Sequence, residues 1–219
     1  MTNRQKMTQP KGYLEIYLGP MYSGKTSKLL DIYKQYSFCN ISVEVINHSS
    51  DTRYHNSMLS THDKVMIPCI QTNNLMDVWE NRDVDDIFNE ISSNHLKLRS
   101  AEVIIINEGQ FFSDLYECVI DMLKEKKRVY IAGLDGDFER KKFGQILDLI
   151  PMCDSVTKLK SLCSICKNGE FGVFSLRLSE EKQQTLVGSD NYIPVCRSCY
   201  DKNSEMSFHS LNILENYLN

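Results

Sequence analysis

The chain has 219 residues, of which 42% are hydrophobic and 25% are charged, so it can form one large domain or one domain with a small appendage. Its net charge of −4 argues against non-specific nucleic-acid binding, because proteins of that class normally carry a basic surface. Residues 1–12 are polar, are expected to be disordered and lack the apolar core of a signal peptide. No stretch approaches the roughly 20 apolar residues of a membrane helix. We therefore expect an intracellular, cytoplasmic protein whose partners include neither a membrane nor nucleic acid.

Hydrophobic patterns predict alternating strands and helices in the first two thirds of the chain. Strands are expected at residues 13–18, 41–47, 102–107 and 128–134, and helices at 27–36, 83–98 and 113–127. Residues 48–63 are polar and are expected to form a long loop. This order predicts an α/β fold with a mostly parallel sheet flanked by helices.

The character of the sequence changes after about residue 150. Helical patterns give way to cysteine pairs, short strand-like runs and turn residues. We therefore expect a domain boundary near Pro151, with a first domain at 13–150, a second at 151–200 and a C-terminal tail at 201–219.

A phosphate-binding motif lies between the first predicted strand and helix. GPMYSGKT matches G-x-x-x-x-G-K-[ST] in the required strand–loop–helix context. Glycines let the backbone N–H groups face a phosphate, and the helix N-terminus adds partial positive charge. Lys25 is expected to contact the β- and γ-phosphates and the Thr26 hydroxyl to bind Mg²⁺. The candidate nucleotide-binding residues are Gly19, Pro20, Met21, Tyr22, Ser23, Gly24, Lys25 and Thr26. The alternative is an ordinary glycine-rich turn with an exposed lysine.

A single site is expected at the carboxyl ends of the parallel strands, where open α/β sheets bind their ligands. The residues that follow the predicted strands there are Lys25, Thr26, Arg53, Asn107, Glu108, Phe111, Asp135 and Phe138. They combine a phosphate cradle, a cation, a carboxylate and aromatic rings, which suit phosphoryl transfer to a flat acceptor. As alternatives, the aromatic residues could belong to the core and Arg53 could be an ordinary surface arginine.

Two Cys-x-x-Cys pairs predict a structural zinc site. The four thiols of Cys163, Cys166, Cys196 and Cys199 suit a tetrahedral Zn²⁺ without an open position for catalysis. Redox or coincidental pairing is the alternative. The metal would join the two ends of the 167–195 segment.

These motifs together resemble the cellular-type (type II) thymidine kinases. The resemblance rests on GPMYSGKT, DTRY followed by THD, NEGQFF, LDGDFERKKFG, LIP and the two cysteine pairs, in order across about residues 13–200. It implies a P-loop domain and a small zinc-ribbon-like domain whose lasso loop covers the nucleoside. The implied reaction transfers the γ-phosphate of ATP, with Mg²⁺, to the 5′-hydroxyl of thymidine or deoxyuridine in nucleotide salvage. The resemblance also implies a homotetramer that is inhibited by dTTP.

The resemblance assigns roles by position. Glu108 matches the general base, and Arg53 matches an arginine near the reacting phosphates. Residues that match the surroundings of the pyrimidine and sugar are Met21, Phe111, Leu134, Phe138 and the lasso residue Tyr192. The main chain of Thr185, Leu186, Val187 and Gly188 matches the segment that bonds the base edge.

Asn107 departs from the resemblance, which implies an aspartate that steadies magnesium. The amide keeps a similar shape and an acceptor oxygen but loses a unit of negative charge. We interpret the chain as a working kinase with weakened or altered magnesium dependence, because the Gly19–Thr26 loop, Glu108 and Arg53 are intact. Two alternatives remain open at this point, a catalytically silent nucleotide-binding sensor or assembly subunit, and a P-loop motor with a zinc module for nucleic acid.

Overall fold

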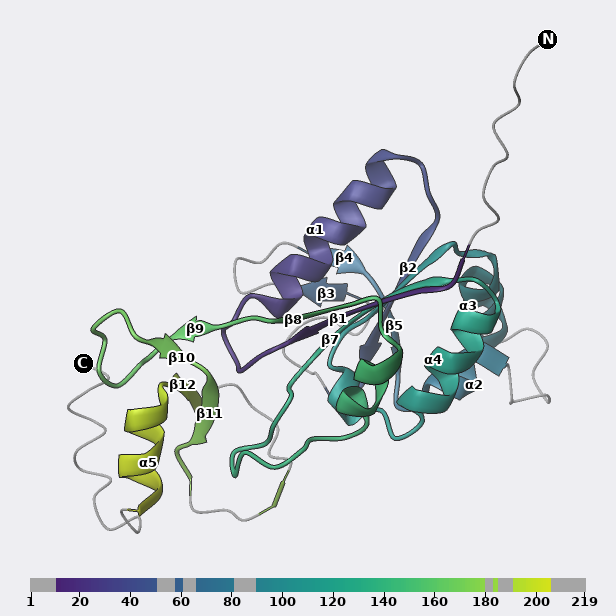
Figure 1. Ribbon diagram of the computed structural model, residues 1–219. Helices are drawn as coiled ribbons and strands as arrows, with labels where there is room; N and C mark the ends of the chain where they lie inside the picture. The colour runs from purple at the N-terminus through teal and green to yellow at the C-terminus, as the bar shows by residue number, and fades with distance from the viewer. Residues whose placement is uncertain are drawn as a thin grey trace.

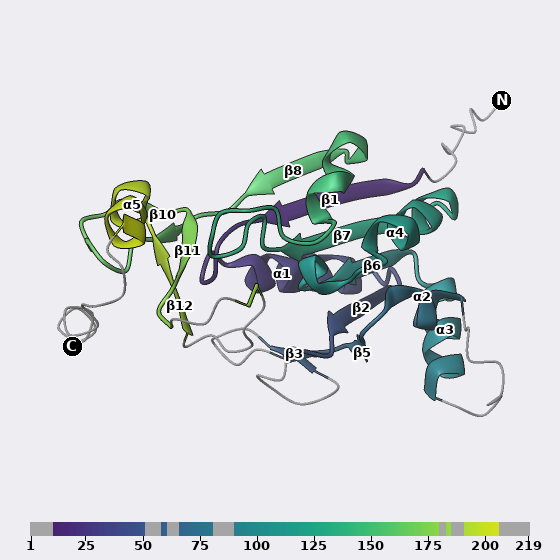
Figure 2. The same cartoon turned by 90° about the horizontal axis from the view of Figure 1, so that it is seen from below.

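A parallel sheet forms the centre of the molecule. The computed structural model describes residues 11–50, 58–60, 66–80, 90–179, 183–184 and 191–205. Its six-stranded sheet has the order β5-β2-β6-β7-β1-β8, and every neighbouring pair is parallel (Figures 1 and 2). The strands are β1 (Tyr13–Leu18), β2 (Val43–His48), β5 (Ile70–Thr72), β6 (Val103–Ile106), β7 (Arg128–Gly133) and β8 (Ser155–Lys158). The α/β prediction and the four predicted strands are confirmed.

Helices cover both faces of this sheet (Figure 1). They are α1 (Lys25–Phe38), α2 (Leu75–Glu80), α3 (Glu90–Ser100) and α4 (Leu115–Lys124), with short 3-10 helices η1 (Gly109–Phe111) and η2 (Ile146–Met152). On one face Leu29 and Leu30 of α1 pack with Ile105, and on the other face Ile104 packs with Leu115. Successive residues of a strand point to opposite faces, so the all-apolar run of β6 is buried on both sides.

The sheet extends past the expected domain boundary. Pro151 lies inside η2, whose Ile146 and Leu149 belong to the main core. The chain then adds β8 beside β1 before it leaves the sheet. The part of the chain that builds the sheet therefore reaches Lys158, and the expected boundary near residue 150 falls within it.

One short strand differs from the expected long loop at 48–63. Strand β3 (Met58–Ser60) lies within that range and pairs antiparallel with β4 (Met66–Pro68), so this part of the loop prediction is wrong. Leu59 and Ile67 are buried in the core beside α1, which explains why this hairpin forms. The remainder of the expected loop from residue 51 lies outside the described residues.

A small domain follows β8. It contains β9 (Ser161–Leu162), β10 (Phe171–Gly172), β11 (Phe174–Arg177), β12 (Tyr192–Val195) and α5 (Arg197–Glu205). The hairpin β11–β12 and α5 lie beyond the carboxyl end of the sheet (Figure 2). Residues 201–205, expected in the tail, continue α5. The described helices include none that is both long and apolar enough to cross a membrane.

Candidate active site

The loop between β1 and α1 has the backbone conformation of a phosphate-binding loop. Gly24 precedes α1 with a φ of 82°, and Gly19 has a φ of 150°. A Cβ on Gly19 would lie 2.6 Å from the carbonyl oxygen of Leu159. Glycine is therefore required at position 19 both by conformation and by space. This loop turns sharply and directs the N-terminus of α1 toward the carboxyl end of the sheet.

Polar groups of this loop suit an anion. The Lys25 ammonium donates hydrogen bonds to the carbonyl oxygens of Gly19 at 3.0 Å and Pro20 at 2.8 Å, which keep it folded over the loop. The Ser23 hydroxyl is buried and has no hydrogen-bond partner among the described residues. A buried polar group without a partner is costly, and a phosphate oxygen would satisfy it. The residues present therefore fit a bound phosphate.

Asn107 follows β6 and is paired with β2. Its side-chain nitrogen donates a hydrogen bond to the side-chain oxygen of Asn47 at 2.9 Å, and both residues are only 2% exposed. Its backbone N–H is bonded to the carbonyl of Ile46. This side-chain hydrogen bond turns the Nδ2 end of Asn107 toward β2. The side-chain oxygen Oδ1 of Asn107 is therefore left for partners other than Asn47.

Glu108 has an uncommon backbone conformation, and its carboxylate is bonded to its neighbour Gln110. Its φ of 53° is uncommon for a residue with a side chain, and such strain clusters at functional sites. The Gln110 amide nitrogen donates to the Glu108 carboxylate at 2.7 Å, and its oxygen accepts from the N–H of Leu134 at 2.9 Å. Gln110, only 3% exposed, thus fixes the carboxylate of β6 relative to the end of β7.

Apolar and aromatic side chains follow the same strands as Glu108. Phe111 is partly exposed, and its ring centre lies 5.4 Å from that of His48 and 5.5 Å from that of Phe143. Leu134 and Phe138 follow β7 and are also partly exposed. The carboxyl ends of β2, β6 and β7 therefore present partly exposed apolar surface, which suits a planar acceptor.

The small domain contributes to the same end of the sheet. The backbone N–H of Met21 in the phosphate loop donates to the Ser175 hydroxyl of β11 at 3.3 Å. Tyr192 begins β12 opposite Arg177, and the Arg177 guanidinium lies 3.7 Å from the centre of the Phe138 ring. The structure thus brings together two of the predicted nucleoside residues, Phe138 and Tyr192, through an arginine that lies between them.

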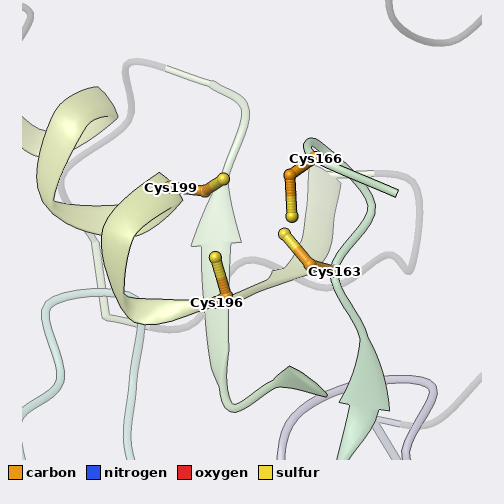
Figure 3. Close-up of side chains that lie close together, drawn as sticks. All are labelled: Cys163, Cys166, Cys196 and Cys199. Carbon is orange, nitrogen blue, oxygen red and sulfur yellow. The ribbon is translucent and has the colours of Figure 1, made fainter. Parts of the chain in front are cut away.

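The two cysteine pairs converge, as the spacing predicts. The sulfur atoms of Cys163, Cys166, Cys196 and Cys199 all lie within 4.8 Å of one another (Figure 3). Zinc–sulfur bonds of about 2.3 Å in a tetrahedron place sulfur atoms about 3.8 Å apart, so the cluster fits Zn²⁺. No other group of three or more His, Cys, Asp or Glu side chains suited to a metal occurs within the described ranges.

The thiol pKa values agree with a site that needs a cation. Burial acts to raise the pKa of Cys163, but backbone N–H groups, including those of Cys166 and Cys196, outweigh it and lower the pKa to about 6. Burial and the neighbouring Cys196 and Cys163 sulfurs raise the pKa of Cys199 to about 12. Four thiols this close cannot all ionise alone, whereas a divalent cation would stabilise the four thiolates.

Sequence comparison decides the family. The family model described as thymidine kinase matches residues 12–200. The chain belongs to the thymidine kinase family. It is 39% identical to the thymidine kinase of Yaba monkey tumor virus, over 90% of this chain and 98% of that protein. It is 35% identical to the cytosolic thymidine kinase of Gallus gallus, over 88% of this chain and 78% of that protein.

Among solved structures, a DNA replication initiation factor shows a weak structural similarity to this chain. It covers 67% of this chain and 40% of its own, with 11% identity and a TM-score of 0.41. A similarity of this size carries no information about function.

Several residues assigned by resemblance to the thymidine kinases fall outside the described part of the chain. These are Arg53 of the DTRY motif and the main-chain segment Thr185, Leu186, Val187 and Gly188. The remaining candidates lie at the carboxyl end of the sheet, in the hairpin of the small domain or in the cysteine cluster.

Three further buried polar residues, which the sequence did not indicate, lie at the candidate site. Asn47 and Gln110 are polar residues that the structure shows to be buried, and Arg177 is a lone charge in the strand-like run FSLRL. A lone buried charge in an apolar strand is itself a signal of a specific partner. The partners of all three come from other elements and so could not be identified from local sequence.

Proposed function

We propose that this protein is a thymidine kinase that transfers the γ-phosphate of ATP to the 5′-hydroxyl of thymidine or deoxyuridine. Membership of the thymidine kinase family is the observation that carries this proposal. The phosphate loop, the buried unpartnered Ser23 hydroxyl and the carboxylate of Glu108 at one end of the sheet support it. No feature of the described structure favours a catalytically silent sensor or a nucleic-acid motor.

In this proposal the phosphate loop binds the donor. The backbone N–H groups of residues 19–26 and the N-terminus of α1 bind the phosphates, with Lys25 moving from its carbonyl partners to the β- and γ-phosphates. The Thr26 hydroxyl and the Asn107 carbonyl oxygen would hold Mg²⁺ or its water shell. Bound with ATP, Mg²⁺ would neutralise charge on the transferring phosphoryl group. Arg53 is proposed to add a second cation at these phosphates.

Glu108 is the proposed general base. A carboxylate that accepts the proton of the 5′-hydroxyl as the oxygen attacks phosphorus is the role that phosphoryl transfer to an alcohol needs. The hydrogen bond from Gln110 orients the carboxylate before the substrate arrives, which lowers the cost of reaching the reactive geometry. Phe111, Leu134, Phe138 and Tyr192 are proposed to surround the nucleoside.

The cysteine cluster is proposed to hold one structural Zn²⁺, and the main chain of residues 185–188 to bond the base edge. We further propose a homotetramer that is inhibited by dTTP and acts in nucleotide salvage. A cytoplasmic location is proposed because relatives from Gallus gallus and Bos taurus are named cytosolic. Size-exclusion chromatography with light scattering, and inhibition curves with dTTP, test these points.

The test of the function is phosphorylation of thymidine by purified protein, with ATP, across a magnesium series. Glu108→Gln should lower kcat by about two to four orders of magnitude while ATP still binds, because it removes the base but preserves the shape. Glu102→Gln is the matched control, because Glu102 is exposed at the opposite, amino end of β6. Binding of ATP without turnover at any magnesium concentration would overturn the proposed function in favour of a sensor.

A further inference from the structure

Arg177 is a charged residue buried at the end of the hairpin in the small domain. It is the last residue of β11, pairs with Tyr192 of β12 and is only 3% exposed. Burying a guanidinium is costly unless several partners satisfy its donors. The position of those partners therefore indicates what the arginine holds together.

The hydrogen bonds of Arg177 reach both ends of the segment that joins β11 to β12. Two of its nitrogens donate to the Tyr192 hydroxyl, at 3.1 Å and 2.5 Å. The third nitrogen donates to the carbonyl oxygen of Gln183 at 2.5 Å, and one of the first two also donates to the carbonyl oxygen of Gln184 at 3.1 Å. The two ends of the segment are also joined directly, because the backbone N–H of Leu178 donates to the carbonyl oxygen of Asn191 at 2.9 Å. One side chain thus joins the outgoing and returning arms of the segment.

The same guanidinium contacts the loop that follows β7. Its central carbon lies 3.7 Å from the centre of the Phe138 ring, within the range of a cation–π contact. A second connection runs beside it, because the Gln184 amide donates to the Asp137 carboxylate at 2.8 Å. The other oxygen of Asp137 accepts the backbone N–H groups of Glu139 and Lys141, both at 2.9 Å, and so shapes this loop.

From this arrangement we propose that Arg177 is a positioning residue for the nucleoside acceptor. It fixes Phe138, Tyr192 and the arm at Gln183–Gln184 relative to one another, so that the acceptor enters a preformed site. Arg177 itself is not a catalytic residue. The proposal deepens the proposed function and rests on it, because Phe138 and Tyr192 are taken to contact the nucleoside.

The role requires the planar shape of arginine. A guanidinium offers a fork of five N–H donors and a flat face, so it can bind three acceptors and stack on a ring simultaneously. Lysine keeps the charge but is a compact ammonium without a face to stack. Arg177→Lys is therefore the informative substitution.

Loss of this arrangement leaves the core of the small domain intact. That core consists of the cysteine cluster packed with Leu176, Val195 and Tyr200, and Arg177 is not part of it. The zinc content of Arg177→Lys should therefore match that of the native protein, and the loss of hydrogen bonds at this buried position should lower Tm without unfolding the small domain. The matched control is Arg197→Lys, because Arg197 is exposed and lies over the ring of Phe174 instead.

The experiment measures steady-state kinetics and calorimetric thymidine binding for native protein, Arg177→Lys and Arg197→Lys. In Arg177→Lys the KM and the dissociation constant for thymidine should rise by about tenfold, as expected when charge-assisted hydrogen bonds are lost. The KM for ATP should change by less than about twofold, because the phosphate loop is untouched. Arg197→Lys should resemble the native protein.

A second set of variants tests whether Arg177 acts through Tyr192. If it does, Tyr192→Phe and Arg177→Lys are coupled, and the double variant raises the thymidine KM by less than the product of the single effects. If the thymidine KM of the double variant rises by the full product of the two single effects, Arg177 does not act through Tyr192.

Three other outcomes would overturn the positioning role. They are equal losses for thymidine and ATP, an unchanged thymidine KM in Arg177→Lys, and an equal effect in Arg197→Lys. Failure of the proposed function looks different, since the native protein would then neither phosphorylate nor bind thymidine.

Discussion

Replacing Asn107 by aspartate tests how the amide at the end of β6 handles magnesium. In the native protein the Asn107 amide nitrogen donates to Asn47 at 2.9 Å, between two side chains that are 2% exposed. Asn107→Asp replaces this donor with an acceptor. Two oxygens then face each other unless the Asn47 amide reverses, and a carboxylate is placed in a buried position.

The size of the effect follows from these two terms. A lost hydrogen bond costs about 0.5–1.5 kcal/mol, and a poorly compensated buried acceptor costs about 1–3 kcal/mol. With partial relaxation through Asn47, we expect the free energy of unfolding to fall by about 1–3 kcal/mol without nucleotide. For a chain of this size that lowers Tm by about 2–12 °C. Magnesium with ATP should reverse much of the loss, because the cation gains a carboxylate ligand or acceptor.

The pH dependence of this loss has a definite sign. Burial raises the pKa of the new carboxyl in the folded state above its unfolded value of about 3.9. The folded state then binds more protons than the unfolded state, so the variant loses stability as pH rises through the interval between the two pKa values. Relative to the native protein, Asn107→Asp should be less stable at pH 8 than at pH 5.

The assay is thermal unfolding at both pH values, with and without magnesium and ATP, together with thymidine phosphorylation at limiting magnesium. Activity should rise by about tenfold, the effect of one charge-assisted hydrogen bond. Asn47→Asp is the matched control, because it adds the same charge on β2, one strand farther from β1 and the phosphate loop. A variant as stable as native protein at pH 8 without magnesium, or equal rescue of Asn47→Asp, would refute the reasoning.

Three further predictions concern glycine, the cysteine cluster and a buried lysine. Gly144→Ala should lower stability by about 3 kcal/mol or more, because its Cβ would lie 2.1 Å from the Gln110 carbonyl oxygen; Gly24→Ala, with nothing within 4 Å, should cost only about 1–2 kcal/mol of backbone strain. Equal costs in urea unfolding would contradict this. Cys163→Ser should reduce zinc from about one ion per chain and lower Tm, as measured by metal analysis and calorimetry; native protein that is folded without chelator yet free of zinc would contradict the site. Burial lowers the pKa of Lys127 from 10.5. The native protein should therefore gain stability relative to Lys127→Met as pH rises between the lowered pKa and 10.5. A difference in unfolding free energy between the two proteins that shrinks over this pH range would contradict the prediction.

The strands with strong apolar patterns were predictable, and the short edge strands were not. The run of β6 and the alternation of β1 are local signals that the structure confirms. Strand β8, SVTK, is mostly exposed at the edge of the sheet and carries no apolar pattern. Its pairing with β1 is a long-range interaction, which a local sequence pattern does not indicate.

The candidate site was predictable where a motif defines its own chemistry. The glycine spacing predicted the phosphate loop, and the cysteine spacing predicted a cluster that the structure brings within 4.8 Å. The Asn47–Asn107 pair was not predictable, because it depends on β2 and β6 being neighbours in the sheet. Arg177 likewise joins elements that are remote in sequence, and only the folded structure shows what it contacts.

The closed base of the β11–β12 hairpin has a consequence for the affinity of the protein for its acceptor. Because Leu178 is bonded to Asn191 and the Gln184 amide to Asp137, Gln183 and Gln184 are tethered beside the loop that follows β7. A tethered segment has a high effective concentration at the site, so its contacts cost less entropy than those of a free chain. Each residue inserted between Leu178 and Asn191 would lower this effective concentration. The affinity for the acceptor should therefore fall gradually as the loop becomes longer.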